Sequence, residues 1–218
     1  MLGWEPWHLS DIEREKVKPT RRELGQLFGV LQLADKDTAQ GCFLAGIPPT
    51  EAERDEWTQQ TEGFCADIDR PVIFRDFTGM LLNANSGARA IFPFASDIRR
   101  KRHQWLEVLF DRTLREIPGW DEQLQNHLTY FVADTPFDIR DDWYREVLIE
   151  MYKSPDFASF WTNALKEAEF NKQVLHGLRD VTMPAVVEGK IQLTPFTRIS
   201  RQAYDPRFRA DFYLPKAA

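Results

Sequence analysis

Segments that favour β-strands stand at both ends of a long helical stretch, and this order limits the chain to a mixed α+β fold. Residues 70–85 carry β-favouring residues on both sides of a four-residue turn that a glycine closes. Near the other end, Gly189 separates residues 184–188 from 190–201, and residues 207–214 alternate between apolar and polar or aromatic side chains. We therefore expect a hairpin first and three antiparallel strands last.

Between these strands, residues 97–168 carry apolar side chains at helical spacing. Breaks are expected at Pro118-Gly119, Pro136 and Ser154-Pro155. Asn85 is a good cap for a short helix that follows the hairpin. The insert holds many of the 16 phenylalanines and 7 tryptophans, which either fill a core or line an apolar cavity.

The first 49 residues form a separate helical unit by pattern. Apolar residues recur at helical spacing from Leu24 to Leu33, and Gly46-Ile47-Pro48-Pro49 ends the unit. The pattern Thr50-Glu51-Ala52-Glu53 predicts a capping box at the start of a helix that runs to about Ala66. We divide the chain into residues 1–49, a connecting helix at 50–69 and a domain at 70–218.

The segment LSDIEREKVKPT at residues 9–20 resembles the end of the recognition helix and the start of the next helix in Xre/Cro-type helix-turn-helix repressors. The resemblance implies a turn glycine at Gly3, a recognition helix at 5–13 and closing helices at 21–33 and 36–45. It also implies a set of residues at the DNA-facing positions: Glu5, Pro6, Trp7, Ser10 and Asp11.

Two features depart from that family pattern. Glu15 stands where the family has a glycine, so we expect the local turn to differ. Met1 stands close before Gly3, so the two helices that brace a recognition helix are expected to be absent, and the module is partial. A small helical appendage without DNA binding is the alternative.

Residues 71–92, PVIFRDFTGMLLNANSGARAIF, resemble the opening of a PAS domain. The order of a helical module, two strands, a helical insert and three strands resembles the MmyB-like ligand-binding family of transcription regulators. This resemblance implies a PAS-like five-stranded antiparallel sheet with helices over one face. It also implies a pocket for a fatty acid or a similar lipophilic effector.

We expect residues of the sheet and of the insert to line that pocket, although core packing is the alternative for any one ring. A buried carboxylate head would need an arginine, and Arg198 and Arg75 are the candidates. The predicted ligand-binding residues are Phe74, Trp105, Leu109, Leu128, Trp143, Val147, Phe160, Phe196, Arg198 and Phe212.

Motifs for catalysis and metal binding are absent from the sequence: there is no GxSxG, HExxH, Walker A, GxGxxG or CxxC, and the four histidines are scattered. Neither an enzyme nor a metal site is expected, and no cofactor other than the effector. Cys42 and Cys65 are expected to be buried thiols. The basic run at residues 99–103 could hold an effector carboxylate or a DNA phosphate, but a solvated helix face is the simpler interpretation.

The formal charge of −6 and the seven acidic against six basic residues in 1–47 give no general attraction to nucleic acid. No long apolar run or signal peptide is present, so a soluble cytoplasmic protein without membrane contact is expected. The leading hypothesis is a bacterial transcription regulator that binds DNA as a homodimer and senses a fatty acid. The alternative is a stand-alone lipid-binding or protein-interaction module.

Overall fold

A computed structural model describes residues 4–98, 102–135, 138, 140–170 and 178–216. Its centre is a five-stranded antiparallel sheet in the order β2-β1-β5-β4-β3. The fold is thus a mixture of helices and one open antiparallel sheet, as the sequence pattern predicts. The strands are β1 (Val72–Asp76), β2 (Leu81–Ala84), β3 (Leu178–Val187), β4 (Lys190–Gln202) and β5 (Phe208–Pro215).

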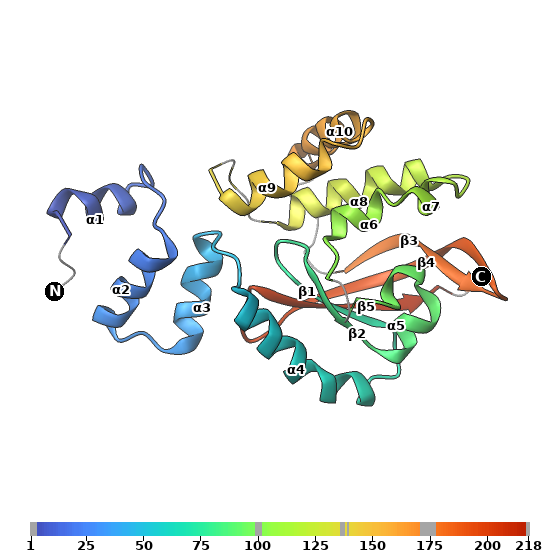
Figure 1. Ribbon diagram of the computed structural model, residues 1–218, viewed down its shortest axis with the longest axis horizontal. Helices are drawn as coiled ribbons and strands as arrows, with labels where there is room; N and C mark the ends of the chain where they lie inside the picture. Colours follow the sequence, from blue (N-terminus) through green and yellow to red (C-terminus); the bar gives the residue numbers. More distant parts are fainter. Residues whose placement is uncertain (1–3, 99–101, 136–137, 139, 171–177, 217–218) are drawn as a thin grey trace.

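Helices cover both faces of the sheet (Figure 1), so the expectation of helices over one face is wrong. One face meets α4 (Glu51–Asp67), whose Trp57 stacks on Phe208 of β5 at 4.8 Å between ring centroids. The other face meets α5 (Ser86–Ile91), the short η1 (Pro93–Ala95) and α8 (Trp120–Asp134), and α6 (Trp105–Leu109) and α7 (Arg112–Arg115) lie against α8. Helix α10 (Phe157–Phe170) packs on α8 farther from the sheet, and α9 (Asp142–Met151) precedes it.

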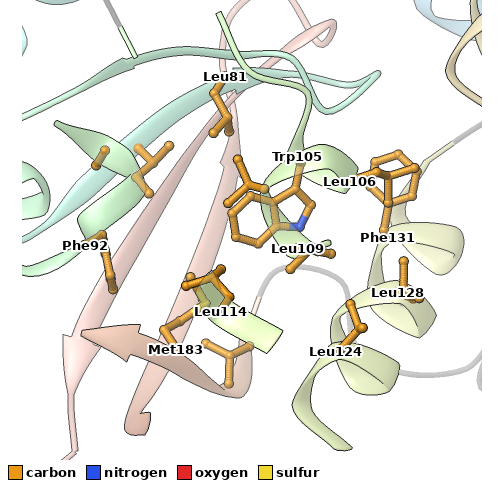
Figure 2. Close-up of a cluster of buried hydrophobic side chains, with 14 of the residues drawn as sticks. Leu81, Phe92, Trp105, Leu106, Leu109, Leu114, Leu124, Leu128, Phe131 and Met183 are labelled. Carbon is orange, nitrogen blue, oxygen red and sulfur yellow. The ribbon is translucent and has the colours of Figure 1, made fainter. Parts of the chain in front are cut away.

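The main core lies between the sheet and the insert. Figure 2 shows Trp105 and Leu109 of α6 between Phe92 and the α8 side chains Leu124 and Leu128. Trp105 makes edge contacts with Phe94 and His127 at 5.5 and 6.0 Å. These side chains fill the interior against one another, which is how most aromatic rings stabilise a fold.

Three helices stand before α4 and form a small unit beside the sheet (Figure 1). They are α1 (Pro6–Glu13), α2 (Arg21–Leu31) and α3 (Asp35–Leu44). Leu24, Cys42 and Ile47 form their own small buried cluster. Capping boxes at Thr20 and Thr50 begin α2 and α4, and the second of these confirms the predicted start.

Several sequence-based details are corrected. Glu15 adopts a left-handed conformation, with φ of 58°, although it carries a Cβ. The third strand begins at Leu178 and not at 184, and Cys65 is half-buried and not buried. Helix α2 ends at Leu31 because Gln32 adopts a left-handed cap. Gly3, Arg99 to Lys101 and Pro136 lie outside the described residues.

Candidate functional site

Six ionisable side chains gather on the sheet face that the insert covers. They come from four strands and from the end of α8: Arg75, Asp134, Arg179, Arg198, Arg209 and Asp211. We call this set the arginine cluster. Its five strand residues are each less than 9% exposed, and the Asp134 side chain is 8% exposed.

Strand register explains why these residues meet. Arg75 on β1 is paired with Arg209 on β5, and Arg198 on β4 is paired with Arg179 on β3. Residues that are paired across an antiparallel sheet point to the same face. Ile73, two residues before Arg75, belongs to the core beneath the insert, so the whole set faces the insert.

Two aspartates divide the arginines between them. Asp134 accepts hydrogen bonds from Nη2 of Arg179 at 2.8 Å and from Nη2 of Arg198 at 3.0 Å. Its backbone carbonyl accepts from Nη2 of Arg209 at 2.9 Å. Asp211 accepts from Nε of Arg75 at 2.7 Å. Arg209 therefore has a carbonyl but no carboxylate as its hydrogen-bond partner among the described contacts.

The cluster holds two more positive than negative charges, since four arginines meet two aspartates. The Nε atoms of Arg179, Arg198 and Arg209 are also buried and have no hydrogen-bond partner within the described part of the chain. Buried unpaired charge costs several kcal/mol, as does a buried donor that bonds to nothing. Such an arrangement is costly without a further anion and favourable with one.

The pKa directions agree with this electrostatic picture. Burial, with repulsion from Arg75, lowers the pKa of Arg209 to about 10. Burial also lowers the pKa of Arg179 despite the nearby Asp134. Burial alone would raise the pKa of Asp211, but Arg75 and Arg198 hold it at about 2. The carboxylates are thus stabilised as anions, while Arg179 and Arg209 are held in a region where positive charge is disfavoured.

The arginine cluster continues directly into the aromatic core. Tyr213 is paired with Arg198 across the sheet, and Phe196 lies two residues from Arg198 on the same face. Phe131 lies one turn before Asp134 on α8. The ring of Tyr130 lies 4.5 Å from the Arg179 guanidinium carbon. The arginine cluster and the aromatic core therefore lie side by side on the same face of the sheet.

The predicted ligand-binding residues fall on two different faces. Phe74 is paired with Ala210, and Phe212 is paired with Val72 and Ile199, so Phe74 and Phe212 face α4. Phe74 and Phe212 therefore cannot line one cavity with the other predicted residues, which lie on the insert side of the sheet. Those residues are Trp105, Leu109, Leu128, Trp143, Val147, Phe160 and Phe196. Arg198 and Arg75 lie in the arginine cluster.

Trp143 also has a role that its spacing did not predict. Its indole Nε1 donates to the Gly46 carbonyl at 3.0 Å, and its ring lies edge-on to Phe77 at 5.6 Å. Phe77, in the β1–β2 turn, makes a second edge contact with Phe43 of α3 at 5.6 Å. Trp143 therefore joins the insert to the N-terminal helices.

The described part of the predicted basic run does not form an anion site. Arg102 pairs with Glu51 and Asp55 of α4, and His103 contacts Asp97 at 3.1 Å. Both border a pocket of about 730 Å³, whose lining also includes the carboxylates of Glu107, Asp111 and Glu150. These carboxylates would repel a second anion, so the arginine cluster is the stronger candidate.

Four of the residues predicted to face DNA lie in α1, and Glu5 is its N-cap. Glu5 and Trp7 are exposed, whereas Ser10 and Asp11 are half-buried, and Asp11 lies 3.5 Å from the Lys16 ammonium group. The side chain of Pro6 lies outside the described residues. Because the Ser10 hydroxyl and the Asp11 carboxylate are half-buried, α1 exposes fewer polar groups to a DNA partner than the motif predicts.

Sequence reasoning missed four members of the cluster: Asp134, Arg179, Arg209 and Asp211. The signal was present in the alternation of residues 207–214, where Arg209, Asp211 and Tyr213 share one face. Because charged side chains usually point to solvent, the sequence predicts that the apolar side of β5, with Phe212, faces the insert. In the structure the charged side faces the insert and the apolar side faces α4.

Comparison with protein-family models and with curated protein sequences finds no match for this chain. Within the described residues no group of three or more histidine, cysteine or acidic side chains is arranged to hold a metal ion. Among the helices of the same residues, none is long and apolar enough to cross a membrane. The case for function therefore rests on the geometry of the chain itself.

Proposed function

We propose that this protein is a bacterial transcription regulator of the Xre type, in which a PAS-like, MmyB-like domain senses a lipophilic anion, with a fatty acid as the main candidate. The observation that carries the proposal is the arginine cluster, with its excess positive charge beside an aromatic core. The strand order 2-1-5-4-3 and the short helices after β2 support the PAS-like assignment.

The physical balance favours such a ligand. An acyl chain gains ~0.8 kcal/mol per buried methylene, so a dozen methylenes contribute on the order of 10 kcal/mol before the costs of binding. A carboxylate head would pair with guanidinium groups that already lack partners for Nε. The same head would offset the charge excess that the folded chain carries alone.

The test is extraction of the purified protein with organic solvent, followed by mass spectrometry. Heterologous hosts supply long-chain acids, so a fatty acid is expected in the extract of the native sequence. Arg198→Met should remove most of it, while Arg201→Met, an exposed arginine on the same strand, should retain it. No extracted lipid, together with no binding of an added fluorescent fatty acid, would contradict the sensor proposal.

The N-terminal helices are proposed to contribute to DNA binding within a complete helix-turn-helix module, which works as a homodimer on two-fold related half-sites. Exposed apolar side chains, among them Trp7 at 61% and Leu44 at 73%, are available for a second copy. Leu9 and Ile12 of α1 and Leu27 of α2 are half-buried and would be covered further by a second copy. Sedimentation velocity across micromolar concentrations tests the dimer, and a clean monomer would exclude it.

A stand-alone lipid-binding or protein-interaction module is the second candidate. The observation in its favour is that Glu5 and Trp7 are exposed at the start of α1, and that α1 contains no lysine or arginine to read guanine. Fluorescence anisotropy with DNA from upstream of the gene distinguishes the two candidates. Nanomolar, sequence-specific binding at physiological salt supports the regulator, and its absence in a chain that binds a fatty acid supports the module.

A further inference from the structure

We infer that a pocket between α3, α4 and the β4–β5 connection binds a small organic cation that also carries a hydroxyl or carbonyl oxygen. The pocket has a volume of about 500 Å³. Trp57 of α4 and Phe208 of β5 belong to its lining, so it lies on the face of the sheet that α4 covers. The arginine cluster lies on the opposite face, and the two sites would hold different ligands.

Aromatic rings form part of the lining. The indole of Trp57 stacks on Phe208, with 4.8 Å between ring centroids and 10° between the ring planes. Tyr204, in the β4–β5 connection, is 72% exposed, and the ammonium group of Lys36 lies 5.8 Å from its ring centroid. The chain thus already places one cation over this ring, whose face attracts positive charge. A ligand cation would compete with Lys36 for Tyr204.

Carboxylates outnumber cations in the lining of the pocket. Glu53 and Asp205 both pair with Arg207, at 2.8 and 2.7 Å. Burial alone would raise the pKa of Glu53, but the hydrogen bonds of the α4 capping box and of Arg207 hold it at about 2. Asp35 and Glu56 also line the pocket, are exposed, and have no ion pair among the described contacts. The lining therefore attracts a cation and repels an anion.

Two hydrogen-bond donors of the lining have no partner. Arg207 is only 6% exposed, and its Nη1 bonds to nothing within the described part of the chain. The buried indole Nε1 of Trp57 also lacks a described partner. Such donors destabilise a fold unless an acceptor reaches them. A hydroxyl or carbonyl oxygen would satisfy a donor without placing a third anion beside Glu53 and Asp205.

The first experiment compares three probes by calorimetric titration of the full chain. Choline carries a quaternary ammonium group and a hydroxyl. The alcohol 3,3-dimethyl-1-butanol has the same shape without the charge, and tetramethylammonium has the charge without the hydroxyl. We expect choline to bind about 10-fold more tightly than the neutral alcohol and about 3-fold more tightly than tetramethylammonium.

The second experiment repeats the choline titration with exposed variants, each with a matched control. Tyr204→Leu should bind choline about 3-fold more weakly, while Tyr152→Leu, an exposed tyrosine after α9, should bind it like the native protein. Glu56→Gln should also weaken binding, and the exposed Glu122→Gln of α8 should not. Lys36→Met should bind choline about 3-fold more tightly, because it removes the cation that competes for Tyr204.

The outcomes decide both parts of the inference. Absence of choline binding, or equal binding of choline and the neutral alcohol, would overturn the cation site. Unchanged choline affinity in both Tyr204→Leu and Lys36→Met would overturn it as well. Equal binding of choline and tetramethylammonium would overturn the requirement for an oxygen. None of these measurements involves a fatty acid, so the sensor proposal stands or fails separately.

Discussion

Replacement of Arg209 by methionine is expected to make the protein without ligand more stable, although a buried hydrogen bond is lost. Burial and repulsion from Arg75 lower the pKa of Arg209 from its usual value to about 10. A fall of that size corresponds to roughly 3 kcal/mol against the charged form in the folded state. At neutral pH the group is charged in both states, so this cost is present in full, and it disappears only as the pH rises past 10.

The stabilisation lost with the Arg209 hydrogen bond is smaller than the cost of burying its charge. Nη2 of Arg209 donates to the Asp134 carbonyl at 2.9 Å, and a hydrogen bond from a charged donor contributes about 2 kcal/mol. Methionine keeps much of the volume and adapts to irregular space. The net expectation is a gain of roughly 1 kcal/mol in the free energy of unfolding, which raises Tm by about 2–4 °C for a chain of this size.

The assay is urea denaturation, together with dodecanoate titration of the same samples. Arg209→Met should unfold at higher urea and bind dodecanoate about 10-fold more weakly, while the exposed Arg201→Met should change neither. A loss of 2 kcal/mol or more in the free energy of unfolding of Arg209→Met would contradict this prediction, because Arg209 would then stabilise the fold as a structural partner of Asp134.

Three further predictions concern neighbouring features. Asp211→Asn removes the carboxylate partner of Arg75 and should lower the free energy of unfolding by about 3 kcal/mol or more in urea denaturation; an unchanged midpoint would contradict the pairing. Gly46→Ala should destabilise by about 1–2 kcal/mol in the same assay because of its positive φ and its close neighbours, while Gly25→Ala, which has open space, should not; equal effects would contradict the tight attachment. Burial lowers the pKa of His127 to about 4. The stability that the neutral histidine contributes is therefore present above pH 6.5 and is lost as the pH falls through 4. The free energy of unfolding of His127→Gln should depend less on pH across this window, and an unchanged pH dependence would contradict a neutral buried histidine.

The hairpin was predictable because its signals are local. Gly79 takes φ of +92° in the turn, and Asn85 accepts from the amide of Ala88 at 2.9 Å to begin α5. The same Asn85 side chain also accepts from Val72, which fixes the helix to β1. Turns and helix caps depend on residues that are close in sequence, so the local sequence is enough to predict them.

The candidate site was only partly predictable because it depends on which face of a strand is covered. Both faces of β5 are covered, one by α4 and one by the insert, so alternation alone cannot tell which face carries the candidate site. Arg209 and Asp211 are buried because residues from distant strands and from α8 supply their partners. Arg198 could be predicted because a buried carboxylate needs a cation as its partner. That chemical argument does not require knowing which face of the sheet Arg198 occupies.

The most direct test of the account compares two ligands that differ only in the head group. Dodecanoate and 1-dodecanol have the same chain length, and each is titrated against a bound fluorescent fatty acid. Dodecanoate should displace the probe at a concentration at least about 10-fold lower than 1-dodecanol does. Arg198→Met should remove this preference, and the exposed Arg201→Met should keep it. Equal displacement by both ligands in the native protein, or displacement by neither, would contradict the claim that the arginine cluster binds a lipophilic anion.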